Sequence, residues 1–212
     1  MNRIDTGVRS RTSPRPLAGE ADAHRAAGEG SRATASQDRP RPSPLPQTED
    51  RDASAAIRNI HQRDFHADAS TAGALIDTLA SSGDRLWPHR WPRIRFDRSL
   101  SVGAIGGHGP IRYAIVAYEP GRSIRFRFSA PHGFIGTHRF HVTPRPDGGA
   151  RLAHVIEMRV EGPAIFTWPI VFRWLHDALL EDLLDRAAAS LGETPRNARW
   201  SPWVRFLRWV SS

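Results

Sequence analysis

Strict alternation of apolar and polar residues in the middle of this chain limits the folds that it can adopt. From Ser123 to Ser129 the sequence SIRFRFS places isoleucine and phenylalanine at every second position, with arginine between them. Successive side chains of a β-strand point to opposite faces, so this pattern indicates a strand with one buried and one solvated face. A sheet of such strands must bury its apolar face against a second layer.

The same two-residue period recurs on both sides of this segment. Turn signals rich in glycine and proline separate the periodic segments, which favours a meander of antiparallel strands. The pattern predicts strands over 57–66, 100–105, 111–118, 123–129, 136–143 and 152–160. The stretch 89–98, which contains Pro92, is expected to be irregular or a short edge strand.

Two other stretches have helical spacing. After the first strand, 71–80 places Leu75, Ile76 and Leu79 on one face, and we expect two short helices in this insert. A long helix is expected over 167–191, which ends before Gly192. Its apolar stripe consists of Trp168, Phe172, Leu175, Leu179, Leu183 and Leu184. The predicted class is therefore α+β, with a long helix lying across a curved antiparallel sheet.

The order of these elements resembles the SRPBCC or START-like superfamily, in its polyketide cyclase and lipid-transport branch. Four stretches between Ile57 and Leu191 carry the resemblance: GGHGPIRYAIVAYEPGRSIRFRF, GTHRFHVTP, LAHVIEMRVEG and RWLHDALLEDLLDRA. The resemblance implies a helix-grip fold, in which about six or seven strands wrap around the C-terminal helix. It also implies a deep hydrophobic cavity that holds lipids, sterols, polyketides or plant hormones, where some members catalyse cyclisation or dehydration. The superfamily has no invariant active site.

Composition divides the chain into three parts. Residues 1–56 contain almost no large apolar side chain, so we expect a disordered tail before a domain over 57–192 and a short segment over 193–212. Cysteine is absent, and no apolar run is long enough to span a bilayer as a helix. With no signal-peptide pattern at its start, the chain is expected in the cytoplasm. The net charge is +8, but the body lacks a dense basic stripe, so no nucleic-acid partner is expected.

Histidine spacing argues against a metal site. His138 and His141 are three residues apart on one predicted strand, so they point to opposite faces. His61 and His66, five apart, fail for the same reason. The glycines near Gly106 fit no dinucleotide or phosphate-loop pattern. We therefore expect neither a metal nor a cofactor.

The faces predicted to point inward carry a few polar groups among apolar neighbours. A mostly apolar cavity with a few convergent polar groups is typical of a small-molecule site. The candidate ligand-binding residues are Tyr113, Phe126, Phe128, His138, Phe140, His154, Met158, Phe172 and His176. In an enzyme, His138 or His154 would move a proton and Tyr113 would hold a developing enolate. Each of these side chains could equally be a structural, hydrogen-bonded residue.

The C-terminal segment 199–210 is predicted to form a short helix capped by Ser201 and started by Pro202. Its apolar face would consist of Trp203, Phe206, Leu207 and Val210, with Arg205 and Arg208 pointing away. Such a face suits either the protein's own domain or an anionic membrane surface. We favour the first, because so short a helix is marginal on its own.

These patterns together favour non-catalytic binding or carriage of a hydrophobic small molecule. A cyclase or aromatase acting on an enolisable substrate is the second hypothesis, so the pattern leaves open whether the protein is an enzyme. A third is an accessory protein that binds a membrane surface or a partner and has only a vestigial cavity. Neither the ligand nor the oligomeric state follows from the sequence.

Overall fold

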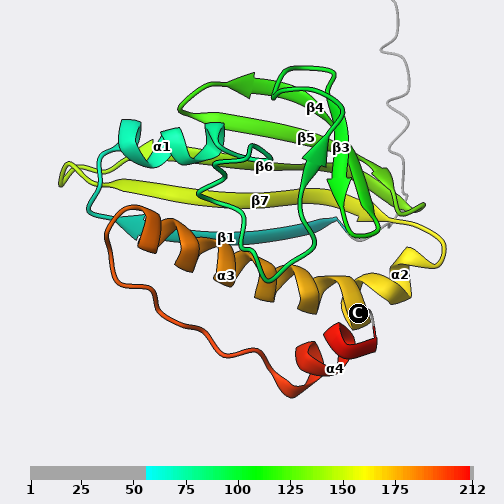
Figure 1. The fold of residues 1–212 in the computed structure, drawn as a ribbon. Helices are drawn as coiled ribbons and strands as arrows, with labels where there is room; N and C mark the ends of the chain where they lie inside the picture. The colour runs from blue at the N-terminus through cyan, green and yellow to red at the C-terminus, as the bar shows by residue number, and fades with distance from the viewer. Residues whose placement is uncertain (1–55, 211–212) are drawn as a thin grey trace, which may run out of the picture. The chain divides into compact units, whose positions relative to one another are not determined.

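The computed structural model describes residues 56–210. The predicted disordered tail, 1–56, lies outside the described residues apart from Ala56. Residues 56–210 form a seven-stranded antiparallel sheet and several helices, the longest of which runs alongside an edge strand of the sheet (Figure 1). The strands are β1 (Ile57–Phe65), β2 (Arg95–Phe96), β3 (Ile105–His108), β4 (Ile111–Glu119), β5 (Ser123–Ala130), β6 (Phe134–Pro144) and β7 (Ala150–Val160).

The strand order β1-β7-β6-β5-β4-β3-β2 confirms the predicted meander. Each strand from β2 to β6 pairs with the next in sequence, while β1 pairs with β7 and forms the other edge of the sheet. Register shifts within β4, near Tyr113 and Ile115, add twist and help to curve the sheet. In β5 the predicted alternation holds, with Ile124 and Phe126 buried and the arginines exposed.

The insert after β1 contains one helix, α1 (Ala69–Asp77), where the sequence predicted two. The Asp68 carboxylate caps α1 by accepting hydrogen bonds from the backbone N–H groups of Ser70 and Thr71. Beyond it, the Asp84 carboxylate accepts from the backbone of Ala80, Leu86 and Trp87. These side-chain hydrogen bonds hold the chain in turns, which explains why a second helix does not form.

The predicted strand over 100–105 is wrong. Gly103 N–H donates to the Ile115 carbonyl and Ala104 N–H to that of Ser101, so this stretch turns. The strand β3 instead runs through the glycines that we expected in a turn. A Cβ at Gly106 would lie 2.1 Å from the Arg95 carbonyl oxygen, so only glycine permits this close strand pairing.

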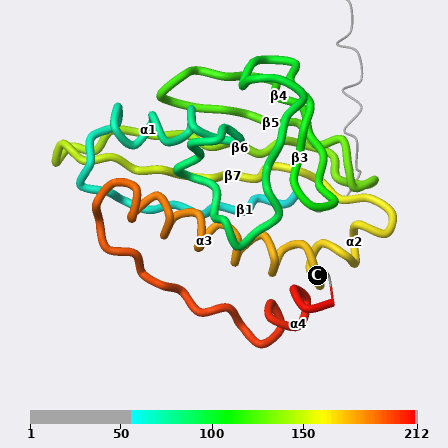
Figure 2. The backbone as a smooth tube through the Cα atoms, viewed as in Figure 1, coloured from blue at the N-terminus to red at the C-terminus, as the bar shows by residue number. Residues whose placement is uncertain are grey.

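The long C-terminal helix is a series of three segments, α2 (Ala164–Thr167), the π-helical turn η1 (Trp168–Phe172) and α3 (Arg173–Ser190). Pro169 lacks the N–H that an α-helical turn would use, and the Arg173 N–H bonds back to the Trp168 carbonyl instead. Figure 2 shows α3 running alongside β1. Its buried face, which includes Leu179, Leu183 and Leu184, joins the main core. None of the described helices is both long and apolar enough to cross a bilayer.

The last helix, α4 (Pro202–Val210), begins at the predicted residue, and Ser201 Oγ accepts a hydrogen bond from Val204 N–H. The face that it buries differs from the prediction. Val204 and Leu207 are buried, whereas Trp203 and Phe206 are exposed. Arg208, which was expected to point away, also faces the domain. Its guanidinium lies 4.5 Å from the ring centroid of Trp91 and donates a hydrogen bond to the Arg90 carbonyl oxygen.

Candidate functional site

A cavity of about 570 Å³ lies between the sheet and the helical segment from Trp168 to Leu180. Its size falls within the range of small-molecule sites. Most of its wall is apolar or aromatic, and the polar side chains on it are His108, Tyr113, His138, His154, His176 and Arg208.

The structure brings almost all of the predicted ligand-binding residues to this cavity. It is lined by Tyr113, Phe126, Phe128, His138, Phe140, His154, Phe172 and His176. Met158 is the exception, and its placement at the cavity was wrong. Met158 packs in a second buried cluster with Phe134 and Trp168, whose rings reach the cavity wall while Met158 does not. The role of these side chains toward a ligand stays a prediction.

Two buried imidazoles form a pair at the centre of the cavity wall. His138 Nδ1 lies 3.1 Å from His154 Nε2, so one ring donates a hydrogen bond to the other. The His138 ring stacks on Phe126 and Phe128, with centroids 4.7 Å away in both cases, and meets Tyr113 edge-on at 4.8 Å. His154 and His176 also contact each other, with ring centroids 5.0 Å apart. Aromatic packing thus fixes the orientation of these imidazoles.

Three ring nitrogens at this wall have no hydrogen-bond partner among residues 56–210. They are His138 Nε2, His154 Nδ1 and His176 Nε2, and all three are buried. A buried polar atom without a partner costs free energy, so native proteins keep few of them. The cavity therefore offers hydrogen-bonding positions to a molecule that enters it.

Burial keeps these imidazoles uncharged. Desolvation lowers the pKa of His138 and His154 well below its usual range, and lowers that of His176 despite the nearby Asp177 carboxylate. Desolvation also lowers the pKa of His108 to about 3. The same cause raises the pKa of the Tyr113 hydroxyl. At neutral pH the cavity thus presents neutral donors and acceptors, with the cationic Arg208 on its wall.

A second group of polar side chains joins β1 to α3 at the edge of the cavity wall. His61 Nε2 lies 3.0 Å from Asp177 Oδ1, and its Nδ1 lies 3.2 Å from Glu181 Oε1. Asn59 donates to the same Asp177 oxygen at 2.9 Å, and the Arg63 guanidinium pairs with Glu181 and Asp185. We call these residues the β1–α3 seam.

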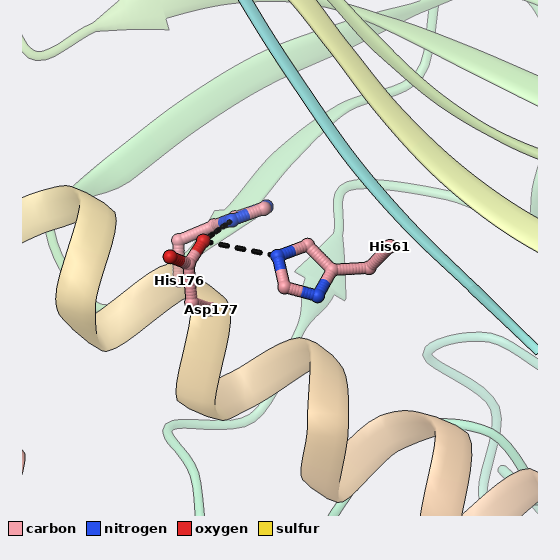
Figure 3. A group of neighbouring side chains, drawn as sticks. All are labelled: His61, His176 and Asp177. Carbon is pink, nitrogen blue, oxygen red and sulfur yellow. Dashed lines mark hydrogen bonds and ion pairs between the residues drawn. The ribbon is translucent and has the colours of Figure 1, made fainter. Parts of the chain in front are cut away.

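Two seam residues, His61 and Asp177, together with His176 of the cavity wall have the residue types of a metal site (Figure 3). Their nearest ligand atoms lie within 4.8 Å of one another, a juxtaposition that histidine spacing along one strand could not predict. The seam nevertheless accounts for them without an ion. Desolvation opposes charge on His61, but its hydrogen bonds to Asp177 and Glu181 outweigh this and raise its pKa. The protonated ring donates from both nitrogens and has no lone pair for a metal, so a metal would have to compete with that proton for His61.

No protein-family model and no curated protein matches the sequence. Solved structures do match. Norcoclaurine synthase from Thalictrum flavum, in complex with dopamine and hydroxybenzaldehyde, aligns over 68% of this chain and 91% of its own, with 14% identity and a TM-score of 0.50. The chain has the helix-grip fold. An identity this low shows the helix-grip architecture alone.

Two other helix-grip structures are similar to a comparable degree. CalU16 from Micromonospora echinospora covers 74% of this chain and 84% of its own, with 13% identity and a TM-score of 0.49. The di-domain ARO/CYC StfQ from the steffimycin biosynthetic pathway covers 63% of this chain and 50% of its own, with 14% identity and a TM-score of 0.49.

Sequence reasoning missed several residues of the helix-grip cavity. Trp87, Trp91 and His108 line it, although they lie in segments that we expected to be irregular or turns. The clustering of large rings in the stretch LWPHRW was the available signal, because aromatic side chains concentrated in an irregular segment need a buried surface to pack on. Arg208 also lines the cavity, and no sequence pattern relates it to the sheet.

Proposed function

We propose that this protein binds a hydrophobic, ring-containing small molecule in the cavity. The single observation that carries the proposal is the wall itself, where aromatic side chains surround buried imidazole nitrogens that no residue of 56–210 satisfies. Burying a ligand's apolar surface here would supply most of the affinity, while the imidazoles would orient it.

The chemistry of the wall narrows the class of ligand. His138, His154 and His176 are neutral at pH 7, so they suit a hydroxyl or carbonyl group better than a carboxylate that needs several cations. Flat rings would pack against the aromatic side chains that line the wall. A polyketide-like molecule with aromatic rings and few polar groups meets both conditions. A cavity of this volume also argues against the hypothesis of a vestigial one.

Enzymatic proton transfer is a second candidate function. It is favoured by the hydrogen-bonded His138–His154 pair and by Tyr113 beside it, which together could take a proton from an enolisable carbon and hold the enolate. The lowered pKa of both imidazoles makes them weak bases, and for this reason we place binding first. Deuterium exchange into an enolisable ketone, lost in His138→Gln, would support this second function.

Filling the cavity tests the binding proposal. Phe126→Trp adds volume beside His138, and we expect it to weaken uptake of an environment-sensitive hydrophobic dye severalfold while changing the free energy of unfolding by less than about 1 kcal/mol. The matched control is Phe65→Trp, since Phe65 is equally buried but lies away from the cavity. The control should lose about 1–3 kcal/mol of stability and keep its dye affinity.

Dye titration and urea unfolding of both variants give the answer. If Phe126→Trp destabilises the fold like the control and leaves dye uptake unchanged, the interior is solid and the proposal fails. Native mass spectrometry of the purified protein adds an independent check, because a bound small molecule would appear as an added mass that the Phe126→Trp variant carries less often.

A further inference from the structure

Eight large apolar side chains are exposed on neighbouring parts of the C-terminal region. We call them the aromatic patch: Ile165, Phe166, Ile170, Trp174, Trp203, Phe206, Trp209 and Val210. Phe166 is 69% exposed and Trp209 is 75% exposed. Single exposed apolar residues are ordinary on a protein surface, but a concentration with this many aromatic rings marks an interaction site.

Two elements form the patch and are joined to each other. Phe166, Ile170 and Trp174 are spaced four residues apart along α2, η1 and α3, so they share one helical face. Trp203 Nε1 of α4 donates a hydrogen bond of 2.8 Å to the Ile170 carbonyl oxygen. Figure 1 shows α4 beside the first turns of this helix. Along α4, the rings of Trp203, Phe206 and Trp209 contact one another in series. The patch is therefore a continuous surface.

Docking of α4 on its own domain does not cover the patch. The side of α4 with Val204, Leu207 and Arg208 packs on the domain, and the opposite side carries the exposed aromatic residues. The helix is thus apolar on both sides. One apolar side packs α4 on the domain. The other apolar side contacts no part of residues 56–210 that would cover it, so it is available to a partner.

The charges around the patch are mainly positive. Arg173 and Arg205 are exposed at its border, and the described residues 193–210 contain four arginines against one acidic residue, Glu193. The Glu193 carboxylate accepts hydrogen bonds from the backbone of His66 and Ala67. Arg173 Nε forms an ion pair of 3.7 Å with Asp177 Oδ2, but its side chain is 61% exposed and the Asp177 carboxylate is shared with the β1–α3 seam. Arginines beside tryptophans suit a surface that is both anionic and interfacial.

We propose that the aromatic patch docks on the surface of an anionic phospholipid bilayer. Tryptophan and phenylalanine would enter the headgroup region, while Arg173 and Arg205 would contact lipid phosphates. The same helical segment uses its other face, with Trp168, Phe172 and Leu175, to line the cavity. Docking would therefore bring a wall of the cavity next to the lipid. Vesicle binding does not depend on the cavity ligand, so this proposal can fail or hold independently of the proposed function.

Vesicle co-sedimentation of the full chain tests the proposal. We expect the protein to sediment with phosphatidylcholine vesicles that contain phosphatidylserine, more weakly with phosphatidylcholine alone, and less as salt is added. The double variant Phe166→Ser/Trp209→Ser should lower binding about tenfold or more, because it removes two side chains that enter the membrane. Arg205→Glu should lower binding to the anionic vesicles about fivefold or more and leave binding to the neutral ones unchanged.

Matched controls distinguish vesicle binding through the aromatic patch from nonspecific binding. Ile60→Ser/Val102→Ser removes two exposed apolar residues outside the patch, and Arg122→Glu reverses an exposed arginine in the turn before β5. Both controls and both patch variants change exposed side chains, so their melting temperatures should stay within about 3 °C of the wild type. The controls should bind vesicles like the wild type.

Three results would overturn the proposal. One is no vesicle binding by the folded wild-type protein, and another is equal loss in patch and control variants. The third is self-association measured by light scattering that Phe166→Ser/Trp209→Ser abolishes while vesicles bind neither form. In that case the patch is covered by a second copy of the chain.

Discussion

The imidazoles of His138 and His154 stabilise each other in a place where either one alone would be costly. Both side chains are buried, and each uses one nitrogen for their mutual hydrogen bond. Removing one ring would leave the other with both nitrogens unsatisfied, whereas replacing both with apolar groups removes the unmet requirement. The pair therefore behaves as one unit, although its two residues lie sixteen positions apart on β6 and β7.

A double-mutant cycle measures this dependence. We expect His138→Leu and His154→Leu each to lower the free energy of unfolding by about 1–3 kcal/mol, since each orphans the other ring. The double variant should lose less than the sum of the two. Urea unfolding at pH 7 gives the three values, and strictly additive losses would show that the hydrogen bond contributes nothing to the fold.

Individual residues show where prediction from the sequence stops. Alternation alone placed Tyr113, Phe126 and His138 on one face, because the period of a strand is fixed by its backbone geometry. Alternation could not place Met158, since the same inward face continues from the cavity into a second packed cluster. It also could not relate His61 to Asp177, 116 residues away, because that contact depends on how α3 crosses the sheet.

Packing between β1 and α3 determines which of their polar side chains contact each other. The seam holds β1 to α3 through Asn59, His61 and Arg63, which point from alternate positions of the strand toward three acidic residues of the helix. The pairs of His61 with Asp177 and Glu181 are only partly buried, so solvent screens them and each contributes modestly. Arg63 is buried, so its pairs with Glu181 and Asp185 also offset the cost of removing its charge from water. Together they fix the height of the helix above the sheet, and that spacing leaves room for the cavity.

The seam makes stability depend on pH in a defined direction. The pKa of His61 is raised in the folded state, so its contribution is fully present below the unfolded pKa of about 6.5 and is lost as pH rises through the higher folded value. Among the groups that face His61, the pKa of Asp177 is held low because hydrogen bonds outweigh desolvation. Glu181 faces the other ring nitrogen, Arg63 contacts Glu181, and the His176 ring meets that of His61.

We expect His61→Gln to cost about 1–2 kcal/mol near pH 6 and clearly less near pH 9. Urea unfolding of wild type and variant at both pH values measures the difference in their free energies of unfolding. Titration of the buried cavity histidines affects both proteins equally, so it cancels in that difference. His66→Gln is the control, because its ring is exposed and the seam does not include it. A cost that grows with pH would contradict the assignment.

Elements were predicted better than their packing. Local sequence patterns predicted the strands from β4 to β7 and the end of α3. Local patterns did not predict the strand through Gly106, because its close pairing depends on the neighbouring segment at Arg95. The π-helical turn was also missed, although Pro169 was a local signal for a break in the helix. The predicted orientation of α4 was wrong because the contacts of Val204, Leu207 and Arg208 with the domain cannot be read from the helix alone.

Two buried hydrophobic clusters stabilise the fold of residues 56–210. The larger one unites α1, β4, β5 and α3, and the smaller one lies around Phe134, Met158 and Trp168. Both contribute residues to the cavity wall, so the cavity lies where the two clusters meet. The helix-grip fold thus gains its stability from the periphery of the cavity, which leaves the interior itself free to vary in content.

An interior that is not filled by side chains also makes the folded molecule larger than its atoms require. Unfolding eliminates internal voids, so the unfolded protein occupies less volume and hydrostatic pressure favours it. We expect pressure to unfold this protein readily, and Phe126→Trp or a bound hydrophobic molecule to raise the midpoint pressure. Tryptophan fluorescence under pressure measures that midpoint. The midpoint pressure would then report occupancy of the cavity without any knowledge of what fills it.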